Sequence, residues 1–310
     1  MCYSILMETD LKRLAAEFDA IIDYPAFLNI YESRSRKVAN LQIPRALDAN
    51  FIKPENEACE RIAQLAAAFE SDKIRQFEQK AFAKRQLIAE LEEKLAKRWS
   101  KTNQAKLDTA KRVLDKALYD IKRLQAGYIW TDRQIFQYSY APLILRVGDQ
   151  KIIRPVRYQI RPRGSHQEYN RKLNLFNART DKLEERTNWK RLFMSQHAVV
   201  VFQGFFEWVE GPDGKSKEIN FFPQGEGFMW APAIYDHWQD PKGQNDIYSF
   251  AILTRDPPEE VAAMGHDRCP VFPQWDFMST WLDPLHHTKE EMYRGFETLH
   301  PVKYDYKWVA

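Results

Sequence analysis

The segment LDTAKRVLDKALYDIKRL (residues 107–124) decides how this chain is organised. Apolar side chains recur in it every three or four positions, which is the spacing of one face of an α-helix. They are Leu107, Ala110, Leu114, Ala117, Ile121 and Leu124. The stretch 55–125 that contains this segment lacks proline and glycine and is rich in Ala, Leu, Lys, Glu and Gln, which favour helices. We therefore expect helix throughout this part of the chain.

Two helices are expected in this stretch, because Ser-Lys-Thr-Asn-Gln at residues 100–104 is typical of a turn. Thr102 or Asn103 is available to cap the second helix. Apolar residues at helical spacing also mark the first arm, at residues 62–69 and 87–95. The sequence predicts a long antiparallel helical hairpin, whose first arm of about 45 residues would reach nearly 70 Å at 1.5 Å per residue.

The flanks of the hairpin are typical of β-structure. Short apolar and aromatic runs at 152–158, 198–202, 219–222 and 248–254 alternate with turn signals. Residues 211–214 and 224–227 are glycine-containing turns that favour hairpins, and Tyr304, Tyr306 and Trp308 alternate as in an edge strand. We also expect an amphipathic helix at 10–22 and a short one at 257–264. The fold class is α+β: one β-rich domain of curved antiparallel sheets with short flanking helices, formed by residues 1–54 and 126–310, into which the hairpin 55–125 is inserted.

Length and composition exclude a disordered or membrane-spanning chain. The 310 residues are 44% hydrophobic and 14% aromatic, which is enough for a sizeable core. The longest apolar run is about five residues, Ala198 to Phe202, against the roughly 20 that cross a bilayer. No secretory leader is visible, and three cysteines do not indicate a disulfide framework. We expect a soluble intracellular protein with no membrane partner.

The positive charge is concentrated in the hairpin. The net charge of the chain is +3, yet residues 70–125 carry 15 Lys or Arg against 9 Asp or Glu. Three interpretations remain open for this surplus: a solvated helix surface, a surface that attracts a nucleic-acid backbone, or a surface on which a partner protein packs.

Cys2 is a candidate nucleophile because of its position. If Met1 is removed, Cys2 presents an α-amine and a thiol on adjacent carbons. Such a 1,2-aminothiol condenses with an aldehyde: the amine forms an imine, and the sulfur closes a five-membered thiazolidine. The alternative is an incidental residue at a frayed terminus.

Three further segments place polar residues where an apolar strand would not: LFNARTD (175–181), GFFEW (204–208) and GHDRCP (265–270). Glu207 is flanked by aromatic residues, so we expect its carboxylate to be partly desolvated and its pKa to be raised toward acid–base use. His266 precedes Asp267 and Arg268, a set able to orient an imidazole and bind an anion. The structural alternatives are a solvent-facing strand glutamate and a loop histidine that caps a turn.

Taken together with Cys2, these segments resemble the SRAP (SOS response-associated peptidase) family. Asn177 to Arg179 is similar to the family's Asn-Ala-Arg, Gly204 to Trp208 to its Gly-x-x-Glu-Trp, and His266 to Pro270 to its His-Asp-Arg-x-Pro, in the family's order. YSYAP (138–142) and VRYQIRP (156–162) match less closely. The resemblance covers roughly residues 1–50 and 128–285 and leaves the helical hairpin unmatched.

The resemblance implies covalent capture of abasic sites in single-stranded DNA. It assigns the thiazolidine to Cys2, hydrogen bonds to the amine end or the sugar to Asn177, amine positioning and proton movement to Glu207, and acid–base work on the sugar ring oxygen to His266. The remaining roles that it implies are phosphate contacts by Arg179 and Arg268, and self-removal of Met1.

Departures from the family pattern concern the DNA contacts. Tyr3 and Ser4 stand where the family has Gly-Arg, and Cys269 stands where it has a further arginine. Arg-Gly-Ser-His follows Pro162 in place of Gly-Trp, so Arg161 and Arg163 are the expected electrostatic substitutes. We expect no metal and no cofactor, since no zinc or dinucleotide motif is complete.

Two other functions stay open. The chain would be a non-catalytic DNA-binding or scaffolding protein if Met1 is retained and the basic hairpin does the binding, with DNA or a protein partner at 55–125. Alternatively, it would be a cysteine peptidase that acts only on its own N-terminus.

Overall fold

The computed structural model describes residues 4–38, 41–165, 175–211, 213–225, 227–243 and 246–308, so Cys2 and Tyr3 lie outside the described residues. The chain divides into two compact units. One combines Met1–Lys53 with Trp130–Ala310, and the other is Pro54–Ile129. Of the helices among the described residues, none has both the length and the apolar composition needed to cross a bilayer.

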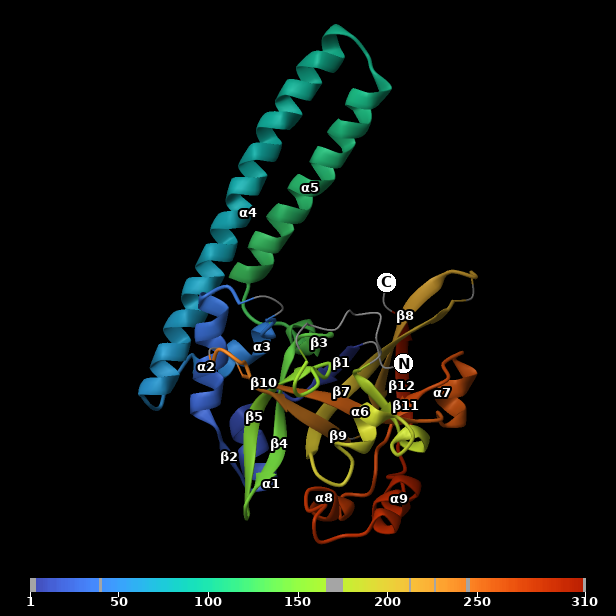
Figure 1. Cartoon of the computed structure of the whole chain (residues 1–310). Coiled ribbons are helices and arrows are strands. Elements are labelled where there is room, and N and C mark those ends of the chain that lie inside the picture. Colours follow the sequence, from blue (N-terminus) through green and yellow to red (C-terminus); the bar gives the residue numbers. More distant parts are fainter. Residues whose placement is uncertain are drawn as a thin grey trace. The chain divides into compact units, whose positions relative to one another are not determined.

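The unit Pro54–Ile129 is an antiparallel pair of helices, α4 (Glu57–Lys97) and α5 (Lys101–Gln125), as Figure 1 shows. At 1.5 Å per residue, the 41 residues of α4 are about 61 Å long. Lys111 of α5 forms an ion pair with Glu92 of α4 at 2.8 Å. The predicted cap at Thr102 or Asn103 is wrong: Ser100 has an extended backbone, and its hydroxyl accepts a hydrogen bond from the backbone N–H of Asn103.

The other unit is built on one twelve-stranded sheet, most of whose pairings are antiparallel. Its strands are β1 (Ser4–Met7), β2 (Ala20–Ile22), β3 (Gln134–Ile135), β4 (Tyr140–Val147), β5 (Gln150–Tyr158), β6 (Asn177–Arg179), β7 (His197–Glu210), β8 (Ser216–Pro223), β9 (Met229–Trp238), β10 (Ile247–Arg255), β11 (Cys269–Pro270) and β12 (Tyr304–Trp308). The α+β prediction, including the helical hairpin and the expected edge strand at 304–308, is confirmed.

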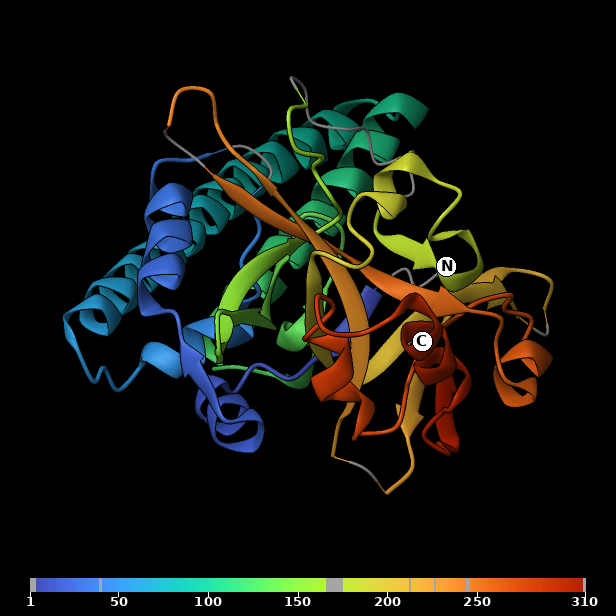
Figure 2. The ribbon, with the colours of Figure 1, turned by 60° about the horizontal axis from the view of Figure 1, so that its bottom comes forward.

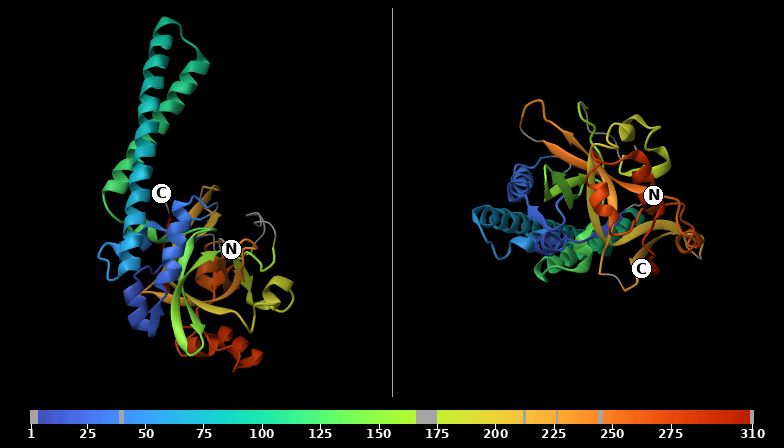
Figure 3. Two further views of the ribbon diagram at one scale, coloured as in Figure 1. Left: turned by 60° about the vertical axis from the view of Figure 1, so that its left-hand side comes forward. Right: turned by 90° about the horizontal axis from the view of Figure 1, so that it is seen from below.

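Five of these strands form a closed ring. β4 pairs with β5, β5 with β10, β10 with β9, β9 with β7, and β7 with β4. The resulting curvature is visible from several directions (Figures 2 and 3). The interior is apolar, and its buried side chains include Leu143, Val200, Phe205 and Phe250. Because the strands form a closed ring, the apolar side chains on its inner face are enclosed and form the core.

Short helices accompany the sheet: α1 (Leu11–Phe18), α2 (Tyr24–Ser35), α3 (Arg45–Asp48), α6 (Thr187–Lys190), α7 (Glu259–Ala263), α8 (Phe277–Trp281) and α9 (Lys289–Glu297). Single 3₁₀ turns are η1 (Ala49–Phe51), η2 (Trp130–Arg133) and η3 (Thr180–Lys182). The helix predicted at 10–22 is too long. Asp19 has a left-handed backbone (φ 49°), which ends α1, and the next residues pair with β5 as β2.

The two predicted glycine turns have different outcomes. The segment after β7 joins β7 to β8, and these strands pair as a hairpin, as expected. The hairpin predicted at 224–227 is wrong, because β8 and β9 do not pair with each other. Both run antiparallel to β7, one along its second half and one along its first, so the chain continues in the same direction through this turn.

Candidate functional site

Glu207 is a buried carboxylate on β7. Successive side chains of a strand point to opposite faces of the sheet, so Glu207 faces the same way as Phe205 and Val209. Both of these residues belong to the hydrophobic core, and Glu207 itself has no exposed surface. A carboxylate in such a place requires polar partners, because an uncompensated buried charge is costly.

His266 is one such partner. Its Nε2 lies 2.9 Å from Glu207 Oε2, and its Nδ1 lies 2.8 Å from the carbonyl oxygen of Arg268. Nδ1 also lies 3.2 Å from the backbone nitrogen of Arg268, so the backbone of Arg268 holds this side of the ring and Nε2 is the nitrogen that faces Glu207. Gly265, which precedes His266, has a backbone φ of +87°, a value that residues other than glycine rarely adopt. The turn at Gly265 directs the imidazole toward β7.

Cys269 and Tyr304 lie near this pair and are hydrogen-bonded to each other. Burial raises the pKa of the Cys269 thiol to about 12, and the nearby Glu207 charge acts in the same direction, against a hydrogen bond with Tyr304. Burial likewise raises the pKa of the Tyr304 hydroxyl. Both groups therefore stay protonated near neutral pH. The sequence did not identify Tyr304 as part of the site, because no motif in the chain connects it with Glu207 or His266.

Asn177 is buried on β6, where the Tyr158 hydroxyl donates to its Oδ1 at 3.4 Å. β6 runs parallel to β10 and places Arg179 opposite Thr254. On β11, Pro270 is also paired with Thr254. The two predicted segments that contain Asn177 and His266 are thus brought to the same end of β10.

The N-terminal strand also meets the site. Ser4, the first described residue, pairs with Phe206, which directly precedes Glu207. Its hydroxyl accepts a hydrogen bond from Gln134 at 2.8 Å. The structure therefore places the start of the described chain beside the Glu207 strand, while the predicted nucleophile Cys2 lies outside the described residues.

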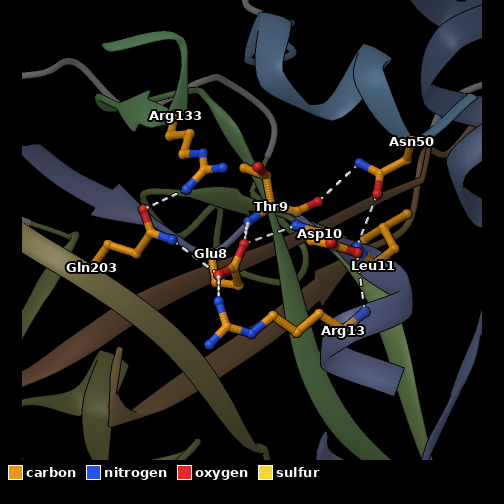
Figure 4. A network of polar contacts seen from close by, with 8 residues as sticks. All are labelled: Glu8, Thr9, Asp10, Leu11, Arg13, Asn50, Arg133 and Gln203. Atoms are coloured by element: carbon orange, nitrogen blue, oxygen red, sulfur yellow. Dashed lines mark hydrogen bonds and ion pairs between the residues drawn. The ribbon is translucent and has the colours of Figure 1, made fainter. Parts of the chain in front are cut away.

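A polar network fixes the other end of this strand, and Figure 4 shows its contacts. Glu8 accepts hydrogen bonds from the backbone N–H groups of Thr9 and Asp10, from Arg13 and from Gln203 of β7. Arg133 in turn donates to Gln203 at 2.7 Å. These contacts hold the C-terminal end of β1 against Gln203 of β7, four residues before Glu207. No sequence motif predicted them.

Arg179 and Arg268, the predicted phosphate ligands, are both paired with carboxylates. Arg179 donates to both oxygens of Asp181, at 2.8 and 2.6 Å, which raises the pKa of Arg179. Arg268 is hydrogen-bonded to Asp256, whose charge also acts on Arg179. The Arg179 side chain is 37% exposed, and a surface pair of this kind contributes about 0–1 kcal/mol, whereas the Arg268 side chain is only 13% exposed.

Arg161 and Arg163 lie elsewhere. The Arg161 guanidinium stacks 3.3 Å from the ring centre of Trp238, and its backbone N–H donates to Ser249 of β10. The backbone N–H of Arg163 donates to Asp236. Ser249 and Thr254 are five residues apart on β10, about 17 Å at 3.3–3.4 Å per residue. These two arginines therefore lie toward the opposite end of β10 from Arg179.

In the parts of the chain that the structure describes, no group of three or more His, Cys, Asp or Glu residues is arranged to hold a metal ion. The chemistry that the described site offers is acid–base chemistry by a buried carboxylate–imidazole pair.

Comparison with protein families gives one match over most of the chain. The model of the family described as SOS response associated peptidase (SRAP) matches residues 80–309. This range begins inside α4 and runs nearly to the C-terminus, so it differs from the expected coverage: it includes part of the hairpin and leaves out the first 79 residues.

Curated relatives match over shorter stretches. The chain is 26% identical over 125 residues to the abasic site processing protein HMCES of Gallus gallus, covering 34% of this chain and 37% of that protein. It is 31% identical over 111 residues to the abasic site processing protein YMR114C of Saccharomyces cerevisiae, covering 35% and 28%. The alignment with YoqW of Bacillus subtilis is 27% identical and covers 36% and 48%. The chain thus matches less than half the length of each relative.

Among solved structures, a protein from Bacteroides thetaiotaomicron shares the fold. The two align with a TM-score of 0.50 at 20% identity, over 57% of this chain and 77% of the other.

Proposed function

This chain belongs to the SOS response associated peptidase (SRAP) family, and from that premise we propose that it captures abasic sites in single-stranded DNA covalently through Cys2. The names of the curated relatives, all abasic site processing proteins, support the substrate. The observation that carries the proposal is the 2.9 Å contact between His266 and Glu207 in an apolar setting, beside the strand on which the chain begins.

The reaction needs an amine, a thiol and a proton carrier. The α-amine of Cys2 attacks the aldehyde carbon of the ring-opened sugar, and water leaves as the imine forms. The sulfur then adds to the imine carbon and its proton passes to the nitrogen, which closes the thiazolidine. One C–N and one C–S bond form, and one water molecule is released in total.

The described residues have matching roles. His266 protonates the sugar ring oxygen as the ring opens, and Glu207 positions the amine and carries protons during imine formation. Asn177 hydrogen-bonds the amine end or a sugar hydroxyl. Cys2 is two residues from Ser4, and two residues span at most about 7 Å. Ser4 is the described residue nearest to Cys2 in the sequence, and it pairs with Phe206, next to Glu207.

Met1 must leave before Cys2 is competent. We propose that the same acid–base pair assists water attack on the Met1–Cys2 peptide bond, so that the chain processes itself. In the intact mass of purified protein, the loss of one methionine residue supports this step. Glu207→Gln with Met1 still attached supports self-processing, whereas complete loss of Met1 in that variant assigns the step to a host aminopeptidase.

The decisive experiment uses an oligonucleotide with a single abasic site. The expected result is a protein–DNA band that survives denaturing electrophoresis with the wild-type chain and is absent with Cys2→Ala. Cys2→Ala and Cys2→Ser both keep the α-amine and lack the thiol, so they test whether the thiol is needed for the stable adduct. No adduct with the wild type, or an undiminished adduct with Cys2→Ala, rejects the proposal.

A second candidate function is non-catalytic DNA binding by the hairpin. A groove between α4 and α5 is lined by Lys84, Lys101 and Lys106 with no acidic residue among its lining, and Trp99 at the turn is 70% exposed. Cations and exposed aromatic rings are the combination that holds single strands without sequence preference. Under this alternative, Met1 is retained and binding of undamaged DNA is unaffected by Cys2→Ala.

A further inference from the structure

A row of three residues crosses the sheet from the acid–base pair to the edge. Glu207 of β7 is paired with Ile219 of β8, and Ile219 is paired with Trp308 of β12. Directly opposite residues of antiparallel strands place their side chains on the same face. Trp308 therefore lies on the face that carries Glu207, two strands away, or about 10 Å at 4.8 Å per strand.

The neighbouring row is entirely aromatic. Phe205 of β7 is paired with Phe221 of β8, which is paired with Tyr306 of β12. Phe205 and Phe221 are buried and stack at 4.9 Å, whereas Tyr306 is 52% exposed and Trp308 is 36% exposed. The apolar face of the sheet therefore emerges into solvent at β12, as two aromatic side chains.

The strand that carries these rings is anchored at the site. Tyr304, which shares their face of β12 by alternation, packs 5.7 Å from the ring of Phe205 and is hydrogen-bonded to the Cys269 thiol beside Glu207. Asp305 points to the other face and accepts a hydrogen bond from Gln224 at 2.7 Å. These contacts fix the position of Tyr306 and Trp308 before any ligand arrives.

Exposed aromatics in this place have no evident structural purpose. β12 pairs with β8 alone among the described strands, and charged Asp305 and Lys307 alternate with the rings on its other face, as is usual for an edge strand. Two exposed rings on the face that carries Glu207 match a surface that stacks nucleobases, since every base offers a π-face and stacking tolerates any sequence.

We propose that Tyr306 and Trp308 form a stacking platform for a base that flanks the abasic nucleotide. This inference rests on the proposed function and adds to it the element that holds intact DNA next to the reacting sugar. The platform acts on docking and not on the chemistry, so its loss weakens DNA binding and leaves the saturated rate of adduct formation unchanged.

The test measures the rate of adduct formation against the concentration of an abasic-site oligonucleotide. For Trp308→Ala and Tyr306→Ala, the half-saturating concentration rises about tenfold while the maximal rate stays at the wild-type value. Trp308→Phe keeps a ring and most of the affinity. Trp275→Ala is the matched control, because Trp275 is 37% exposed, much like Trp308, but lies in the segment before α8 and not on β12. We expect this variant to behave as the wild type.

Anisotropy with an undamaged oligonucleotide, in a Cys2→Ala background, separates this proposal from the proposed function. If the wild type forms no adduct but Trp308→Ala still weakens binding of undamaged DNA about tenfold, the covalent function is wrong and the stacking surface stands. If Trp308→Ala and Tyr306→Ala match the wild type in both assays, or if Trp275→Ala loses as much affinity as they do, the platform is rejected.

Discussion

His266 and Glu207 meet at 2.9 Å where almost no water reaches them: the histidine side chain is 9% exposed and that of the glutamate 1%. The backbone of Arg268 holds the Nδ1 side of the His266 ring, so Nε2 is the nitrogen that faces the carboxylate. A carboxylate and an imidazole at this distance are able to act together as a general acid and base. The proposed chemistry depends on this pair.

Replacing Glu207 by Gln is the most direct test of this pair. The amide has the same shape but exchanges no proton, so we expect adduct formation by Glu207→Gln protein prepared without Met1 to slow by about 10²–10⁴-fold, with little change in fold. Single-turnover kinetics with an abasic-site oligonucleotide measures the loss, and circular dichroism checks the fold. An unchanged rate in a variant that has lost Met1 would contradict the role given to the carboxylate.

If Arg268 contacts a phosphate of DNA, as proposed, Asp256 competes with the DNA for this arginine. This carboxylate is 84% exposed and hydrogen-bonded to Arg268, so Asp256→Asn releases the guanidinium and we expect DNA to bind about two- to fivefold more tightly at low salt. Arg268→Ala is expected to weaken binding and to reduce the slope of log affinity against log salt by about one. Anisotropy titrations at several salt concentrations measure both effects. If Arg268→Ala leaves both the affinity and the salt slope unchanged, Arg268 does not contact phosphate.

His197 makes the fold sensitive to acid. Burial, opposed by a hydrogen bond to the Trp281 carbonyl, lowers the pKa of His197 to about 4. Its neutral form is the folded one, so the stability it contributes is complete above the unfolded pKa of 6.5 and is lost as pH falls toward 4. At pH 5 the unfolding free energy should be lower by about 2 kcal/mol from this group alone.

Urea unfolding at pH 7.5 and pH 5 measures this change. His197→Gln serves as the comparison: it is less stable at both pH values, and the difference between them should shrink by about the same 2 kcal/mol. An equal difference in both proteins would show that other groups cause the acid sensitivity.

Cys269 makes the fold sensitive to base. The folded pKa of about 12 exceeds the ordinary thiol pKa of 9.0, so the thiol stabilises the fold fully below pH 9 and progressively less as pH rises to 12. At pH 10.5 the expected loss is about 2 kcal/mol. Cys269→Ser keeps a hydrogen-bonding group that does not ionise, so its unfolding free energy should fall less between pH 8 and 10.5. A parallel decline would exclude the thiol as the cause.

The hairpin prediction concerns the groove lysines. Reversing Lys84, Lys101 and Lys106 together to Glu should lower the affinity for undamaged single-stranded DNA at least tenfold and flatten its salt dependence, if the groove holds a phosphate backbone. The matched control reverses Lys73, Lys80 and Lys122, which lie on the same two helices but do not line the groove. Equal losses in both variants would point to net charge alone, and no loss in either would favour a protein partner or a solvated surface.

Some of the site could be predicted from the sequence. Glu207 and His266 stand out as polar residues in apolar or compact surroundings, and the structure brings them together, as it brings the segments of Asn177 and Arg179 to the same end of β10. Arg161 and Arg163 do not join Arg179 and Arg268. Tyr304 and the Glu8 network could not be found in advance, because a lone tyrosine or glutamate in the chain gives no sign of which strand it will face.

The hairpin was determined by the sequence itself. Helix propensity, the absence of proline and glycine and the capping side chains at its ends are local properties, since each hydrogen bond of an α-helix joins residues four apart. Only the tertiary structure decided the register of β7 against β1, β8 and β12. A shift of one residue in any of these pairings turns every side chain to the other face. The meeting of Glu207 with His266, and the shared face of Glu207 and Trp308, are properties of that register, which no stretch of the chain specifies alone.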